Sequence, residues 1–167
     1  MIPEDALLEL LNTTPMVGGA VQDALDDGDE GRAWTRQHGG TGSTAELRHL
    51  IAARDALQDV VRGNADAACL GEFLTEARSV PDISTGRLEW ILHTPAEMRL
   101  ASEAVLTWAT LQENRPGRLR PCANPQCRRF LLDRSKPNTA RWCSMAECGN
   151  RMKARRHYQR AKDAQTS

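Results

Sequence analysis

The chain has 167 residues, enough for one medium-sized domain with a small appendage and too few for two full-sized domains. Hydrophobic residues make up 40% and charged residues 26% of the sequence, the composition of an ordinary globular protein rather than a disordered one. No apolar run approaches the roughly 18 residues of a membrane span, and the acidic start, Glu4 and Asp5, lacks the plan of a signal peptide. We therefore expect a cytoplasmic protein with no membrane contact.

The formal net charge of zero conceals an uneven distribution of charge along the chain. Residues 1–114 carry 8 arginines, no lysine and 19 acidic residues, a net charge of −11. Residues 115–162 carry 14 lysines and arginines against Asp133 and Glu147, a net charge of +12. Such an asymmetry indicates a nucleic-acid-binding segment at the basic end.

Short helices separated by turns are predicted for the first forty residues. An apolar run at residues 7–11 predicts a first helix, which should stop at Pro15 because proline cannot continue it. A second short helix is expected to end at Gly28. A third is expected to run from Asp29 to the Gly39-Gly40 pair, with glycine as the stop.

The clearest predicted helix begins at Ser43, because Ser43 and Glu46 have the spacing of a capping box. Its apolar stripe is Leu47, Leu50, Ile51, Leu57 and Val61. The next helix is expected after Asn64. It should bury Leu70, Phe73, Leu74 and Ala77, at spacings of three and four residues. Cys69, which stands alone in this pattern, is interpreted as a small buried apolar residue.

A small hairpin is predicted between residues 80 and 92, with its turn at Thr85-Gly86. The helix that follows is expected to begin at residues 94–97, where Thr94 supplies the cap and Pro95 and Glu97 suit the first turn. Its buried face is Met98, Ala101, Val105 and Trp108. Residues 112–117 are the predicted linker.

No enzyme activity is expected, because residues 1–114 contain no Gly-rich phosphate loop, nucleophile elbow or pair of histidines on one helical face. His38 and His93 are isolated and receive no role. Core packing is the interpretation for Trp34, Trp90 and Trp108. The alternative is a ligand or substrate pocket, whose best case would be lined by Trp90, Arg99 and Trp108.

Four of the five cysteines form two close pairs, Cys122 with Cys127 and Cys143 with Cys148. Four residues separate the members of each pair, and fifteen separate the pairs. A reducing compartment disfavours disulfides, and pairs so spaced can wrap a tetrahedral ion. We predict one structural Zn²⁺, because four thiolates leave no open coordination position. A redox pair and an iron–sulfur cluster are the alternatives.

The predicted finger has a tight knuckle at residues 123–126 and a helix from about Ser144. Hairpin arms are expected at residues 129–132 and 141–142, on either side of the polar stretch 133–139. Only eight large apolar residues lie between 119 and 162, too few for an independent core. The metal is therefore expected to be required for folding.

At these residues the sequence resembles a known family. The run Cys148-Gly149-Asn150-Arg151 spells the signature of the CGNR zinc-finger family. Other residues similar to its motif are Cys122, Cys127, Phe130, Asp133, the run Arg141-Trp142-Cys143-Ser144-Met145, Lys153 and the basic tail through Arg160. In that family the finger follows a domain called ABATE, which is regarded as a stress-induced transcription regulator. Leu8-Glu9-Leu10-Leu11-Asn12-Thr13 and Ala53-Arg54-Asp55-Ala56-Leu57 resemble two of its weaker signatures, with Glu9 where aspartate is usual.

The segment from Arg151 to Lys162 contains no acidic residue and is expected to form a helix. Lysine and arginine at this density would release counterions from a phosphate backbone, which gives salt-dependent and largely sequence-independent affinity. The candidate DNA-binding residues are Asn150, Arg151, Lys153, Arg155, Arg156, Arg160 and Lys162.

Asn150, Arg151 and Arg155 are candidates for base contacts, because the start of a helix can enter a major groove. Phosphate positioning is the alternative for the two arginines, and local hydrogen bonding is the alternative for Asn150. Met152 is expected to face the zinc core, and Gly149 to let the backbone pass close to the metal sulfurs. Further cations could widen the basic surface, neutralise the tetrathiolate or dock on the acidic domain: Arg128, Arg129, Arg134, Lys136 and Arg141.

We therefore predict an α+β, predominantly α fold. Residues 1–114 form an ABATE-like helical domain with a small β-hairpin, and residues 115–167 form a treble-clef-like, four-cysteine zinc finger with a basic C-terminal helix. The predicted function is a zinc-dependent, stress-responsive transcription regulator that binds double-stranded DNA. The alternative is an adaptor that binds protein or RNA. The N-terminal domain is a candidate for sensing a small-molecule effector, contacting a protein partner or forming a homodimer.

The opposite charges of the two halves suggest a restraint on the basic half. A short linker gives the two surfaces a high effective concentration for one another, so the acidic domain could mask the basic finger from DNA. The alternative is that the charges face away from each other and keep each surface solvated.

Overall fold

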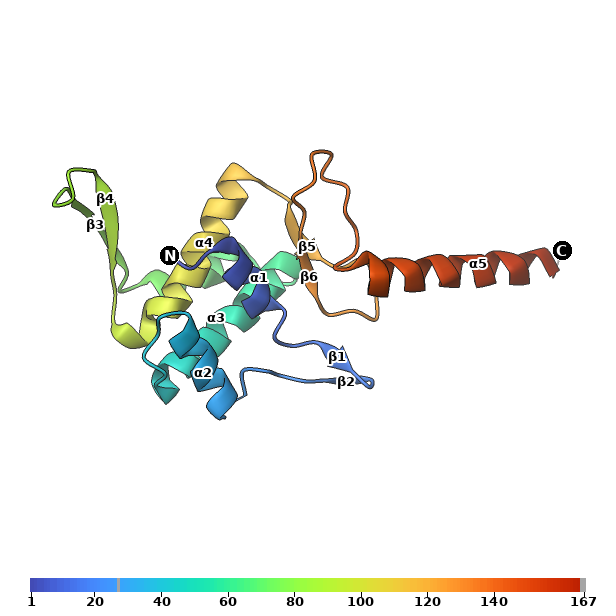
Figure 1. Ribbon diagram of the computed structural model, residues 1–167, viewed down its shortest axis with the longest axis horizontal. Helices are drawn as coiled ribbons and strands as arrows, with labels where there is room; N and C mark the ends of the chain where they lie inside the picture. The colour runs from blue at the N-terminus through green and yellow to red at the C-terminus, as the bar shows by residue number, and fades with distance from the viewer. Residues whose placement is uncertain (27, 166–167) are drawn as a thin grey trace.

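The computed structural model describes residues 1–26 and 28–165. The molecule is elongated, with a helical body in the middle, a β-hairpin projecting from one end and the C-terminal helix projecting from the other (Figure 1). Small antiparallel hairpins accompany the helices. The α+β, predominantly helical fold class is therefore confirmed. Among the described residues, no helix combines the length and apolar character needed to cross a lipid bilayer.

The body is built from α1 (Glu4–Leu11), α2 (Asp29–Gln37), α3 (Thr44–Arg62) and α4 (Arg99–Asn114). α3 lies in the middle and packs against the other three helices (Figure 1). Leucines supply most of the core, and the fully buried ones include Leu10, Leu11, Leu25, Leu47, Leu50, Leu57 and Leu100. The helices predicted at residues 7–11, from Asp29 and from Ser43 are confirmed.

The second helix predicted before Gly28 is wrong. Residues 16–21 instead form a short hairpin, β1 (Met16–Val17) paired with β2 (Ala20–Val21). Its turn is Gly18-Gly19, whose φ angles of 60° and 88° lie in the left-handed region that glycine adopts without strain.

The Ser43 cap is confirmed on one side only. The Ser43 hydroxyl accepts a hydrogen bond from the Glu46 N–H at 3.1 Å. The Glu46 carboxylate does not return to Ser43. It is buried and accepts from the Gly42 N–H and the Thr41 hydroxyl, each at 2.9 Å, so it fixes the loop before α3.

The helix predicted after Asn64 is a 3₁₀ helix, η1 (Ala67–Leu74). Leu70 and Phe73 are buried, as predicted, whereas Leu74 is half-buried and Ala77 lies beyond the helix. Cys69 is exposed, so its interpretation as a buried residue is wrong. With three residues per turn, positions 70 and 73 share the buried face and position 69 does not.

The hairpin predicted between residues 80 and 92 is confirmed as β3 (Arg78–Asp82) and β4 (Glu89–His93). It projects from the body, and Trp90 is 64% exposed (Figure 1). The core assignment is therefore wrong for Trp90. It is confirmed for Trp34 and Trp108, which are partly buried and pack against the core.

The predicted cap at Thr94 is wrong. A 3₁₀ turn, η2 (Ala96–Met98), precedes α4, and the buried Thr94 hydroxyl makes no hydrogen bond. The predicted inner face of the helix is confirmed, because Ala101 and Val105 are buried and Met98 and Trp108 pack against the core.

Candidate metal centre and basic helix

The C-terminal segment folds as β5 (Leu119–Pro121), β6 (Phe130–Leu132), a π-helical turn, η3 (Met145–Gly149), and α5 (Asn150–Gln165). β5 and β6 pair antiparallel and hold the knuckle between them. The predicted hairpin arms are therefore wrong, because β6 pairs with β5 and not with residues 141–142. A backbone hydrogen bond of 2.8 Å from the Ala123 N–H to the Arg141 carbonyl joins the latter segment to the knuckle.

A loop organised by the Asp133 carboxylate replaces the second arm. The carboxylate accepts hydrogen bonds from the Ser135 N–H at 2.8 Å, the Ser135 hydroxyl at 2.6 Å and the Ala140 N–H at 2.7 Å. Arg120 donates to it at 2.6 Å. The Ser135 hydrogen bonds, followed by the one from the Ala140 N–H and the charge of Arg120, lower the pKa of Asp133 to about 2. The loop thus closes around an ionised carboxylate.

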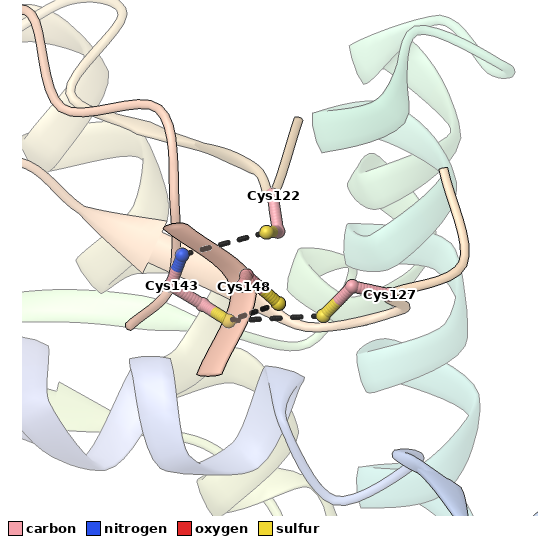
Figure 2. Close-up of side chains that lie close together, drawn as sticks. All are labelled: Cys122, Cys127, Cys143 and Cys148. Atoms are coloured by element: carbon pink, nitrogen blue, oxygen red, sulfur yellow. Dashed lines mark hydrogen bonds between the residues drawn. The ribbon is translucent and has the colours of Figure 1, made fainter. Parts of the chain in front are cut away.

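Four sulfurs meet beside this loop (Figure 2). The Sγ atoms of Cys122, Cys127, Cys143 and Cys148 all lie within 4.8 Å of one another. Cys143 Sγ is 3.7 Å from both Cys127 Sγ and Cys148 Sγ. A tetrahedral site with Zn–S bonds of about 2.3 Å has S···S edges of about 3.8 Å, so the sulfurs fit one Zn²⁺.

Two N–H groups point at these sulfurs from the surrounding chain. The Cys143 N–H donates to Cys122 Sγ at 3.5 Å (Figure 2), and the Asn124 side-chain amide donates to Cys148 Sγ at 3.4 Å. Asn124 is fully buried, and its side-chain oxygen accepts from the Gln126 N–H. Donors of this kind orient ligands and tune a metal site.

The environment acts differently on the individual thiols. Burial, together with the neighbouring sulfurs, raises the pKa of Cys143, and burial raises that of Cys127. For Cys148 burial acts in the same direction, but hydrogen bonds from Asn124 and the neighbouring thiols outweigh it and lower the pKa. A bound Zn²⁺ supplies the positive charge that keeps all four groups as thiolates.

The turn that carries Cys148 leads directly into the basic helix. Ser144 caps η3 by accepting from the Glu147 N–H at 3.3 Å. A Cβ at Gly149 would lie 2.7 Å from the Met145 sulfur and 3.3 Å from Trp142. A side chain at position 149 would therefore require Met145 to shift.

α5 projects away from the body (Figure 1). Met152 is half-buried, and the predicted DNA-binding residues are all exposed: Asn150, Arg151, Lys153, Arg155, Arg156, Arg160 and Lys162. Arg155 donates to the Gln126 side chain, and the Asn150 amide contacts the Ala146 carbonyl at 3.5 Å. This local contact corresponds to the alternative given for Asn150.

The body of the finger, in contrast, is attached to the helical domain. The Asn12 side chain accepts from the Phe130 N–H at 2.7 Å and donates to the Phe130 carbonyl at 3.3 Å, as a strand neighbour would. The Arg62 guanidinium lies 4.4 Å from the centre of the Phe130 ring. Leu119 and Phe130 are buried in the same core as the helices.

Ion pairs accompany this attachment, between Arg115 and Glu4 and between Arg134 and Asp5. Arg134 thus docks on the acidic domain, one of the alternatives given for the finger's cations. In the part of the chain that the structure describes, α5 points away from the helical body (Figure 1). This arrangement gives no support to masking of the basic helix by the acidic domain, and we do not propose it.

The same segments match two family models. Residues 4–124 match the family called ABATE, described as "Putative stress-induced transcription regulator". The chain belongs to the ABATE family. Residues 118–161 of this ABATE protein match the CGNR zinc finger, and the four cysteines therefore form the site of a single structural zinc. The two matches overlap at residues 118–124, where β5 joins the core. A search of curated proteins gave no significant match.

Proposed function

We propose that this ABATE protein is a zinc-dependent, stress-responsive transcription regulator whose helix α5 binds double-stranded DNA. One observation carries the proposal: α5 projects from the zinc centre and exposes six lysines and arginines between residues 151 and 162, with no acidic residue among them. The family description supports a regulatory role, and it names no DNA site.

The dimensions of α5 suit a duplex. A helix of 16 residues is about 24 Å long, and the major groove of B-DNA is about 12 Å wide, enough to admit a helix. Arg151 and Arg155 lie one turn apart near the start of the helix, next to the metal centre. We assign base contacts to these two residues and phosphate contacts to the cations farther along.

Zinc has a directing role in this proposal. Cys148 ligates the metal two residues before α5 begins, and Met152 is half-buried at its first turn. The metal therefore fixes the direction in which α5 leaves the body. Four thiolates leave no open coordination position, so we propose a structural and not a catalytic role for the metal.

The test is binding of the zinc-loaded chain to fluorescent random duplex DNA, followed by selection of the bound sequences. If α5 neutralises about five phosphates, the logarithm of the association constant should fall with the logarithm of salt concentration at a slope near −4.5. Replacing Arg151 and Arg155 with alanine should weaken binding to the selected sequences and relax their consensus, because these two residues are assigned to bases. Replacing Arg156 and Arg160, which are assigned to phosphates, should reduce the magnitude of the slope by about 1.8.

The matched control removes two exposed arginines from the helical domain, Arg48 and Arg87, and should leave both the selected sequences and the slope nearly unchanged. Unchanged binding by the Arg151 and Arg155 variant would place the interface elsewhere. Single-stranded and duplex RNA are compared at the same salt concentration. Tighter binding to RNA than to duplex DNA would favour the alternative, an RNA-binding adaptor.

A further inference from the structure

The β3–β4 hairpin exposes a large amount of apolar surface. Five large hydrophobic side chains on it are exposed to between 41% and 71%: Val80, Ile83, Leu88, Trp90 and Ile91. The hairpin stands away from the helical body at the end opposite α5 (Figure 1). A two-stranded ribbon alone in water is at best marginally stable, and exposed apolar patches commonly mark protein contacts.

Only one edge of the hairpin suits further strand pairing. β3 contains Pro81, which lacks an N–H and is typical of an edge strand that pairs with no further strand. β4 contains no proline, and its five residues pair with β3 in an uninterrupted register from Glu89 to His93. Among the described residues the sheet has no third strand, so the outer edge of β4 is open.

Charged side chains mark the two ends of the hairpin. Arg78 lies opposite His93 at one end, and Asp82 lies opposite Glu89 at the other. Adjacent carboxylates destabilise a sheet. Because side chains alternate between faces, all four lie on one face, with the Val80–Ile91 pair between them. This face is basic at one end, apolar in the middle and acidic at the other end.

We propose that the chain forms a homodimer through this hairpin, in which β4 pairs antiparallel with β4 of a second copy around Ile91. The two hairpins then make one four-stranded sheet. His93 of each copy lies opposite Glu89 of the other, so each basic end meets an acidic end. Ile91 meets Ile91 of the second copy in the middle of the same face.

The residues on the opposite face of the hairpin are compatible with this register. The same pairing places Trp90 opposite Leu92 of the second copy, an aromatic–aliphatic contact that covers part of the most exposed tryptophan. Pro81 opposite Trp90 within the hairpin fits a non-hydrogen-bonded pair, which leaves the Trp90 N–H and C=O at the outer edge. The outer edge of β4 therefore presents backbone donors and acceptors where the second copy needs them.

The charge pattern selects a second copy over a foreign strand. Reversing the direction of β4 exchanges its basic and acidic ends and leaves the apolar centre in place, so the strand is complementary to itself about a two-fold axis. Such self-complementarity is what an isologous interface requires. A foreign partner would need no symmetry about Ile91.

The first test is a disulfide across the proposed axis in zinc-loaded full-length protein, in a Cys69→Ser background. Directly opposite residues have Cα atoms about 4.5–5.5 Å apart, within disulfide reach. Ile91→Cys should therefore cross-link two copies when treated with oxidised glutathione. The control is Val80→Cys, which is equally exposed on the same face but would lie about 14 Å from its counterpart, three strand spacings away.

The second test uses the charges. Glu89→Lys and His93→Glu, both at exposed positions, should each weaken dimerisation. The first places a lysine in the same cross-strand row as Arg78, and the second places a glutamate opposite Glu89. An equimolar mixture of the two variants should restore it, since lysine at 89 then faces glutamate at 93. Sedimentation velocity of each variant and of the mixture provides the readout, without DNA.

Three results would overturn the proposal. The first is a monomeric wild-type chain at roughly 100 µM, where a dimer with a micromolar Kd would be almost fully assembled. The second is equal cross-linking of the Ile91 and Val80 variants. The third is a dimer that neither charge substitution weakens. Because no readout involves DNA, each outcome is independent of the DNA-binding role of α5.

Discussion

Two buried polar side chains, Asn124 and Arg54, fix parts of the chain that are distant in the sequence. Asn124 lies within the zinc knuckle and donates to the Cys148 sulfur. Arg54 is 1% exposed, and its guanidinium donates to both oxygens of Asp23 at 2.6 and 2.8 Å and to Thr13 at 3.1 Å. The resemblance to ABATE signatures included both Thr13 and Arg54, and the structure brings them into contact.

The zinc ligands could be predicted from the sequence, because cysteines paired at short spacing in a reducing compartment are typical of a metal site. The Asn124 and Arg54 contacts could not. Asn124 and Cys148 are 24 residues apart, and Arg54 and Asp23 are 31 residues apart. A single polar residue shows no spacing pattern that would reveal so distant a partner.

Replacing Cys143 with serine tests the four-thiolate site. Cys143 Sγ lies 3.7 Å from two other ligand sulfurs, so the variant should lose stoichiometric zinc and the fold of its C-terminal segment. Metal analysis and circular dichroism provide the measurement, and Cys69→Ser, at the exposed cysteine, is the control. Full zinc content in the Cys143 variant would disprove the site.

Replacing Asp23 with asparagine should destabilise the fold by about 1–2 kcal/mol, because the buried Arg54 loses its main counter-charge. The Asp23 side chain is 34% exposed, which reduces the effect below that of a fully buried pair. Asp55→Asn is the control. It removes a 57% exposed partner of Arg54 and should cost less than about 1 kcal/mol. Urea unfolding at neutral pH measures both.

The sign of the pH dependence follows from the pKa of Asp23. Burial would raise this pKa, but the hydrogen bonds from Arg54 and Leu25 outweigh burial and lower it. The stabilisation from Asp23 is therefore fully present above the unfolded-state pKa of about 3.9, and it is lost as the pH falls through the lower folded-state value. A stabilisation that grew below that pH would contradict this assignment.

Among the elements, those that could be predicted have strong local signals. The helix after Ser43 has a cap and an apolar stripe, and the β3–β4 hairpin has its Thr85-Gly86 turn. The β1–β2 hairpin and η1 are too short for a clear periodicity, so neither was predicted as it occurs. The pairing of β6 with β5 was not predicted. Each strand has only three residues, and their pairing depends on the burial of Leu119 and Phe130 in the core, which the local sequence does not show.

The contact between α1 and β6 provides a test at this scale. Asn12→Ala removes two hydrogen bonds to Phe130, and the unfolding free energy should fall by about 1–3 kcal/mol because the strand edge loses its partner. Asn64→Ala, at an exposed asparagine after α3, is the control for urea unfolding. If both variants unfold at the same urea concentration as the wild type, Asn12 does not hold the finger.

For the molecule as a whole, the continuous core couples zinc binding to the stability of the helices. Leu119 and Phe130 are buried in the same core as the helices, where β5 contacts α3 and β6 contacts α1, and both lie beside the zinc knuckle. A ligand that binds only the folded state raises stability by mass action. Zinc should therefore stabilise the helical body and not only the finger.

Removing zinc with a chelator should lower the temperature at which the helices unfold, with a single transition in the zinc-loaded protein. Far-UV circular dichroism follows the helices during heating with and without the metal. Readdition of zinc should restore the original transition, and readdition of magnesium is the control. A helical transition that is the same in both states would show that the finger folds independently.

The hairpin and α5 lie at opposite ends of the long axis of the molecule (Figure 1). A two-fold axis through β4 would therefore send the two basic helices outward in opposite directions. Dimers that read a palindrome need their helices about 34 Å apart, one turn of DNA, and this arrangement would not bring them together. Such a dimer would bind two separate stretches of duplex and keep them at a fixed distance. Its genomic targets would be dispersed single sites rather than inverted repeats.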